Sequence, residues 1–300
     1  MVVREQDTSR AREVRRVLLV VMTLNLVVSV AKIVIGVLTG TNSVRGDGIH
    51  SIFDSLGNLA GIIGISLAAR PADESHPYGH GKFETAASLV IGVMLLIAAF
   101  EVGSGAVNTL VTGEYGAQPS ALALGIMVVT LVVNITLTTY EQRAGRRLNS
   151  SVLGADSKHT LSDALVTISV IVGLIFVNLG FPIADPIATL IVTVAIVATA
   201  VDVFKDVLHT FSDAVRIDPQ EIERSVMEVP GVMAVHRVRT RGLENEVYAD
   251  LHVLVDPAMT IQRAHEISDE VERKLAASYP QLSEVVVHLE PATAEELREA

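Results

Sequence analysis

The chain has 300 residues, of which 50% are hydrophobic, 19% are charged and none is cysteine, and its formal net charge is −11 at neutral pH. Such a large apolar share is atypical of an ordinary soluble protein. The absence of cysteine excludes disulfide bonds and thiolate ligands, so any metal site must use histidine and carboxylate side chains.

The N-terminal residues 1–13 are polar, and we expect them to form a cytoplasmic segment. This polar stretch is too long for the first region of a secretory signal, and no small-residue cleavage site follows the first apolar run. That run is therefore expected to remain in the mature protein.

The region 14–209 is expected to form a six-helix transmembrane domain. About 20 helical residues cross roughly 30 Å of hydrocarbon, and the sequence contains six apolar segments of suitable length. These segments lie near 14–38, 44–69, 83–108, 119–140, 153–179 and 186–208. The chain is thus predicted to be a multi-pass protein of the lipid bilayer.

The distribution of lysine and arginine predicts the orientation of these segments. Cations precede the first segment and occur in the second and fourth loops, whereas the first, third and fifth loops contain none. Cytoplasmic loops carry the excess of lysine and arginine. Both termini are therefore expected in the cytoplasm, with the protein in the cell inner (cytoplasmic) membrane.

The last part of the chain, residues 210–300, is predicted to be a soluble cytoplasmic domain for metal binding and dimerisation. It contains 18 acidic and 9 basic residues. Its helical and alternating patterns follow the order αββαβ, which suggests a two-layer α+β domain with helices on one face of an antiparallel sheet. Pairing with a second copy would help so small a domain to bury a core.

The motif DxxHxxxD occurs twice, once in the second predicted span and once in the fifth. Its polar residues are three and four positions apart and therefore share one helical stripe. Ionisable side chains inside a bilayer are costly and usually functional. The six residues are Asp47, His50 and Asp54 in the first copy, and Asp156, His159 and Asp163 in the second.

The second and fifth spans run in opposite directions, which allows the two motifs to meet. Asp54 and Asp163 each lie about eleven residues, or roughly 16 Å, from the start of their span, which is near the bilayer midplane. Two imidazoles and two carboxylates suit a tetrahedral ion such as Zn²⁺. The proposed ligands are His50, Asp54, His159 and Asp163.

Metal and protons compete for such ligands, because a metal needs neutral histidine and ionised aspartate. If the site opens alternately to each side, this competition yields efflux of the metal in exchange for protons. Asp47 and Asp156 are predicted either to relay ions or to cap helices near the interface, and the sequence favours neither role.

These features resemble the cation diffusion facilitator family over nearly the whole chain. The likeness rests on six spans, HxxxD in the second and fifth spans, the loop RPADESHPYGHGKFE (70–84) and the C-terminal domain. It implies a homodimeric, proton-coupled zinc exporter with a cytoplasmic ferredoxin-like domain. His50 stands where some bacterial zinc and cadmium exporters of the family have aspartate, which favours zinc over cadmium.

The resemblance also implies metal sites outside the membrane. One is a weaker site in the loop, formed by Asp73, His76 and His80. The other lies in the soluble domain, where the matching positions are His236, His252, His265, His288 and Glu290. Three of these histidines fall on separate predicted strands, and Glu290 shares a face with His288, so the strands can bring them together. A regulatory interface is the alternative for the same residues.

The sequence gives less support to other classes of function than to metal export. No HExxH string supports a zinc protease, so an intramembrane aspartyl protease using Asp54 and Asp163 is the remaining enzymatic alternative. A channel is disfavoured because a four-ligand site binds too tightly for fast passive flow. The acidic C-terminal region disfavours nucleic-acid binding. A metal-responsive scaffold without transport stays open, as does the choice among Zn²⁺, Fe²⁺, Co²⁺ and Ni²⁺.

Overall fold

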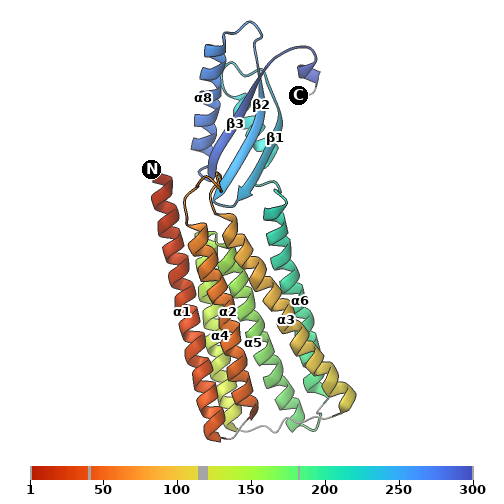
Figure 1. Ribbon diagram of the computed structural model, residues 1–300. Coiled ribbons are helices and arrows are strands. Elements are labelled where there is room, and N and C mark those ends of the chain that lie inside the picture. Colours follow the sequence, from red (N-terminus) through yellow and green to blue (C-terminus); the bar gives the residue numbers. More distant parts are fainter. Residues whose placement is uncertain (1, 40–41, 114–120, 182, 299–300) are drawn as a thin grey trace. The chain divides into compact units, whose positions relative to one another are not determined.

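A computed structural model of the protein describes residues 2–39, 42–113, 121–181 and 183–298 (Figure 1). Within these helices, some side chains also lie outside the described part, including those of residues 42–50 and 53–54. The chain divides into two compact units, Met1–Val207 and Leu208–Ala300. Each unit is considered by itself.

The described part of the first unit is a bundle of six long helices, and each corresponds to one predicted span (Figure 1). The first helix begins before residue 14, and the fourth continues beyond residue 140, because arginine and glutamate favour a helix as much as apolar residues do. The helices are α1 (Val2–Thr39), α2 (Asn42–Ala68), α3 (Lys82–Thr112), α4 (Ala121–Leu148), α5 (Ser151–Asn178) and α6 (Ala184–Phe211).

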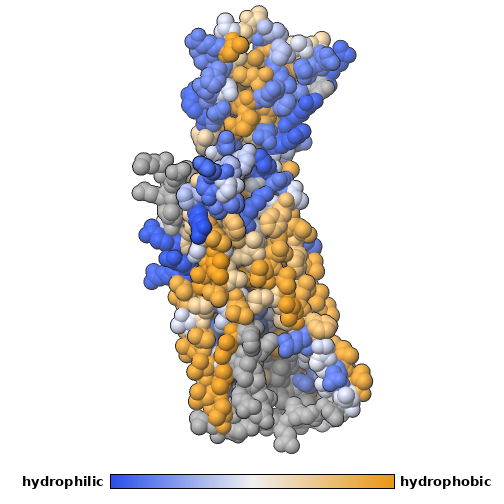
Figure 2. Space-filling model, in the orientation of Figure 1, coloured by the Kyte–Doolittle hydropathy of each residue, from blue (hydrophilic) through white to orange (hydrophobic). Residues whose placement is uncertain are grey.

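The outside of this bundle is apolar. By length and composition, three stretches within the described residues could cross a membrane, namely Ser9–Val34, Lys82–Thr112 and Ala184–Phe211. Figure 2 shows hydrophobic side chains along the visible face of the helices. Phe100 is 77% exposed and Val194 is 69% exposed. Lipid rather than water suits such a surface, because helices satisfy their own backbone groups.

Small residues allow the helices to approach closely. A Cβ atom at Gly64 of α2 would lie 2.3 Å from the Cβ of Ala87 of α3, and one at Gly103 of α3 would lie 2.8 Å from the Cγ2 of Thr193 of α6. Packing between close backbones is a main source of helix association in membranes. Glycine at these two positions is therefore required by the packing of α3 against both neighbours.

Polar contacts join four helices at one end of the bundle. Arg10 of α1 donates to both carboxylate oxygens of Glu84 of α3 at 3.0 and 3.2 Å. It also donates to the carbonyl oxygens of Leu148, the last residue of α4, and of Asn149, which precedes α5. The hydroxyl of Ser150 donates to the same carboxylate. The Glu84 side chain is only 7% exposed, so these donors compensate a buried charge.

We predict that Arg10→Ala destabilises the helical unit by about 3 kcal/mol, because it leaves the Glu84 carboxylate buried without its cation. The midpoint of thermal unfolding in detergent would measure the loss. Arg16→Ala, which removes an exposed arginine from the same helix, is the matched control. Equal midpoints for the two variants would contradict the structural role of Arg10.

The second unit has the predicted element order. Asp218 caps its first helix by accepting a hydrogen bond from the Gln220 N–H, and Thr260 caps the second by accepting from the Arg263 N–H. The elements are α7 (Pro219–Met227), β1 (Ala234–Leu243), β2 (Glu246–Val255), α8 (Ile261–Ser278) and β3 (Leu282–Pro291), followed by a short 3₁₀ helix, Glu296–Arg298.

The expectation of an antiparallel sheet is wrong for one of its two strand pairs. The strand order is β1-β2-β3, with β1 antiparallel to β2 and β2 parallel to β3. The reason is the connection, because α8 crosses over between β2 and β3 and brings the chain back to start β3 at the same end as β2. The sheet is therefore mixed.

Strand alternation separates a core face from an open face of this sheet. Leu251 and Val253 of β2 belong to the core that includes Ile222 of α7, Ile267 and Val271 of α8. His252, between the two core residues of β2, points to the opposite face. In the described part of this unit, α7 and α8 thus cover the core face of the sheet, and the face that carries His252 is called the open face.

Candidate metal centres

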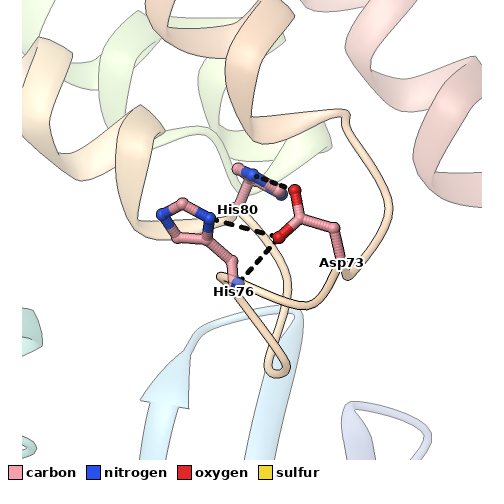
Figure 3. A group of neighbouring side chains, drawn as sticks. All are labelled: Asp73, His76 and His80. Carbon is pink, nitrogen blue, oxygen red and sulfur yellow. Dashed lines mark hydrogen bonds and ion pairs between the residues drawn. The ribbon is translucent and has the colours of Figure 1, made fainter.

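The α2–α3 loop gathers Asp73, His76 and His80, as predicted (Figure 3). One ligand atom from each residue lies within 4.8 Å of the others. The Asp73 carboxylate is 3.4 Å from His76 Nδ1 and 3.4 Å from His80 Nε2. Asp73 and His76 are exposed, whereas His80 is buried. The arrangement has the ligand types of a divalent metal site.

The tautomer of His80 is fixed by its other ring nitrogen. His80 Nδ1 lies 3.1 Å from the carbonyl oxygen of Pro71, which can only accept, so Nδ1 carries the hydrogen. In the neutral ring, Nε2 then presents a lone pair to the Asp73 carboxylate. Two acceptors face each other there, and a cation between them, either a proton or a metal ion, resolves the conflict.

Asp73 is held in its ionised form. Hydrogen bonds from the Ser75 hydroxyl and from the backbone N–H of His76 lower the pKa of Asp73 to about 2. These bonds are 2.7 and 2.8 Å long and both go to Oδ1. The carboxylate is thus available as a charged ligand at any physiological pH.

The cytoplasmic unit gathers a second group on the open face of its sheet. His236 pairs with His252 across β1 and β2, and His252 pairs with His288 across β2 and β3. Glu290 accepts from His236 Nε2 and from His252 Nδ1, each at 2.8 Å. His288 is more exposed, with Nε2 3.5 Å from the same carboxylate. Three strands thus bring together four of the predicted residues.

Opposing effects act on the Glu290 carboxyl group. Burial raises the pKa of Glu290, but the hydrogen bonds from His236 and His252 outweigh this effect, so the pKa is lowered. The two carboxylate oxygens bridge both rings, with Oε2 accepting from His236 and Oε1 from His252. The described geometry therefore accommodates glutamate at this position.

The structure does not bring His265 into this group. It lies on α8, its side chain is 74% exposed, and its Nε2 is 3.8 Å from Asp269 of the same helix. The packing of α8 against the core face of the sheet explains the separation, because the other histidines occupy the open face. A metal role for His265 stays a prediction.

In the membrane unit, the structure describes half of the predicted transport site. His159 is buried on α5, and its Nδ1 is 3.6 Å from Asp163 Oδ2. The helical spacing of four residues accounts for this contact. His50 and Asp54 belong to α2, but their side chains lie outside the described residues, as does that of Asp47.

Asp156 occupies neither a helix cap nor an exposed position. Ser150 caps α5 by accepting from the Leu153 N–H, and Asp156 lies in the second turn with 3% exposure. Its carboxylate accepts from the Asn58 amide of α2 at 2.5 Å. The capping alternative for Asp156 is therefore wrong.

Sequence reasoning missed Asn58 and Glu141, both of which lie beside Asp156. Glu141 of α4 is fully buried and within hydrogen-bonding reach of the Asp156 carboxyl group. The available signal was a glutamate at the end of an apolar run, and it resembled an ordinary interfacial residue. Only the packing of α4 against α5 reveals the contact.

Comparison with protein families decides the identity. Residues 18–211 match the cation efflux transmembrane domain, and residues 215–292 match the cytoplasmic domain of cation efflux proteins. The chain belongs to the cation efflux family. This cation diffusion facilitator is a transporter of divalent cations and not an enzyme. It is a multi-pass membrane protein with a cytoplasmic C-terminal domain.

Curated relatives of this cation efflux protein match along nearly all of its length. An uncharacterized transporter of Methanocaldococcus jannaschii is 33% identical over 93% of this chain and 99% of its own length. A probable cation efflux system protein of Mycobacterium tuberculosis is 32% identical over 95% of this chain and 85% of its own length. The manganese efflux system protein MneS of Bacillus subtilis is 27% identical over 89% of this chain and 91% of its own length.

Among solved structures, the cytoplasmic unit matches a variant of the MamM CTD. The identity is 27% and the TM-score 0.24, with 25% of this chain and 90% of that chain covered.

For the loop of this transporter, we predict that His80→Ala weakens metal binding there by more than tenfold, since loss of even an outer partner costs roughly 10–100-fold. Equilibrium dialysis of the full-length protein with Zn²⁺ would measure the loss. Glu74→Gln, which changes an exposed neighbour, should leave binding unchanged. Unaltered binding by His80→Ala would count against the loop site.

For the sheet, we predict that Glu290→Gln lowers the metal affinity of the cytoplasmic unit, because an amide has no charge to balance the ion. Calorimetric titration of the full chain would report the change. Glu284→Gln is the matched control, being an exposed glutamate on the same strand and face. The same loss of affinity in both variants would contradict a specific role for Glu290.

Proposed function

We propose that the protein exports Zn²⁺ from the cytoplasm, across the cell inner membrane, in exchange for protons. The proposed transport ligands are His50, Asp54, His159 and Asp163, with alternating access to a site near the bilayer midplane. The observation that carries the proposal is the contact between the buried His159 and the half-buried Asp163 on α5 of a cation efflux transporter.

The contact between α2 and α5 supports the position of the other two ligands. The helices run antiparallel (Figure 1), and Asn58 meets Asp156 at 2.5 Å. Because the helices are antiparallel, the residue four positions before Asn58 in α2 lies level with the residue four positions after Asp156 in α5. Position 54 is therefore level with Thr160, and position 50 is level with Ala164. Positions 50, 54 and 58 also share one helical face. This count supports a shared level for the two halves of the proposed site.

The ligand chemistry supports zinc, with other metals as alternatives. Imidazole nitrogens suit Zn²⁺, Fe²⁺, Co²⁺ and Ni²⁺, whereas all-oxygen sites suit Mn²⁺. The relative MneS is named for manganese efflux, which makes Mn²⁺ a necessary competitor in any assay. A metal-responsive scaffold without transport is the remaining alternative.

The protein is proposed to act as a homodimer, and the loop and the cytoplasmic unit are proposed to regulate transport. A second copy could cover the open face of the sheet, where His236, His252 and Glu290 converge. The match to the family's cytoplasmic domain, whose model is named for dimerisation, supports this assembly. Metal bound at this sheet site, and at Asp73 and His80 of the loop, would signal a high concentration of metal in the cytoplasm.

We predict that Asp163→Ala abolishes uptake of Zn²⁺ into proteoliposomes driven by a pH gradient, because it removes one of two charges that offset desolvation of the ion. Fe²⁺, Co²⁺, Ni²⁺ and Mn²⁺ are tested as competitors under the same gradient. Asp206→Asn, an exposed aspartate of α6, is the control and should transport normally.

Two outcomes would contradict the proposal. Full uptake by Asp163→Ala would exclude this residue from the transport site. A wild-type protein that moves no ion under any gradient would favour the scaffold.

A further inference from the structure

The membrane unit contains a group of buried oxygen atoms that the proposed transport site does not use. Glu141 of α4 is 0% exposed, and Asp156 of α5 and Asn58 of α2 are 3% and 2% exposed. The group joins three helices. Such side chains are rare in a bilayer interior unless they face a partner or a pathway.

These atoms have too few hydrogen-bond donors. The Thr160 hydroxyl also lies near Glu141, but its one hydrogen is donated to the Asp156 carbonyl oxygen at 3.2 Å. Asn58 donates to Asp156 at 2.5 Å, but Oε1 and Oε2 of Glu141 and Oδ1 of Asn58 are buried without a partner among the described residues. The two carboxyl groups nevertheless lie within hydrogen-bonding reach of each other. Two ionised carboxylates cannot bond to one another, because both only accept. One proton between them supplies the missing donor.

From this geometry we propose that Glu141 and Asp156 share one proton at neutral pH and form a proton-binding site separate from the metal ligands. Two carboxyl groups at contact distance cannot both remain charged in an apolar interior, so the pair retains one proton and one negative charge. Among the described residues, His159 and Asp163 of α5 are the titratable neighbours that act on the pair.

The position of the pair gives it a role in exchange. The C-terminal domain is cytoplasmic and follows α6, so α5 begins on the cytoplasmic side. Asp156 precedes His159 by three residues, about 4.5 Å along the helix. The pair therefore lies between His159 and the cytoplasm. It exchanges its proton with the cytoplasm, a step that rests on the proposed function.

Infrared difference spectroscopy of the full-length protein in lipid nanodiscs tests the shared proton without requiring transport. We expect the wild type to show the carbonyl band of a protonated carboxylic acid at neutral pH. Glu141→Gln and Asp156→Asn should each remove it, and Glu13→Gln, an exposed glutamate of α1, should not. Either carboxyl variant suffices for the comparison if the other does not fold.

The absence of this band from the wild type, or its retention in the folded carboxyl variants, would overturn the proposal. Loss of one bound Zn²⁺ per chain in Glu141→Gln, with no band in the wild type, would instead identify a metal site.

Proton-driven uptake tests the role in exchange. Glu141→Gln should slow Zn²⁺ uptake roughly tenfold or more, because a proton acceptor is lost from the path, while Zn²⁺ binding at the transport site persists. Normal uptake by this variant would overturn the relay. Absence of uptake by the wild type would refute the proposed function only, since the infrared result stands on its own.

Discussion

The cost of burying carboxyl groups between apolar helices is the constraint on which the membrane unit depends. A charge within a low-dielectric interior must find an opposite charge, a donor or a proton. Glu84 is compensated by Arg10 and by the Ser150 hydroxyl. Asp156 accepts from Asn58, and Asp163 lies beside His159. The first two solutions join helices of the bundle, and the third joins two of the proposed transport ligands.

The same constraint separates structural carboxyl groups from those suited to bind ions. Glu84 is fully provided with donors, so it holds helices together and has no need of another cation. Both carboxylate oxygens of Glu141 are buried and accept no hydrogen bond of good geometry from the described residues, and the lone pair of His80 faces the Asp73 carboxylate. Unsatisfied acceptors of this kind attract protons or metal ions. The contrast follows from hydrogen-bond geometry and not from the residue type.

The polar group of the cytoplasmic unit differs from those of the membrane unit, because it lies on a sheet and not between helices. The antiparallel pairing of β1 with β2 places His236 beside His252, and the parallel pairing of β2 with β3 places His252 beside His288. A histidine row across the strands results, with Glu290 bridging two of its rings. The core face below it is packed by α7 and α8, whereas the row runs from the buried His236 to the exposed His288.

The sequence by itself predicted the helical spans and the αββαβ order, and its resemblance to the family implied the residues that converge in the loop and on the sheet. The spans and the element order are local properties, since hydrophobic period and loop charge depend on neighbours along the chain. Tertiary structure alone decided the parallel pairing of β3, the separation of His265 and the contact of Glu141 with Asp156. Those outcomes depend on which helices and strands pack together, and contacts between residues far apart in the chain leave no periodic signal in one sequence.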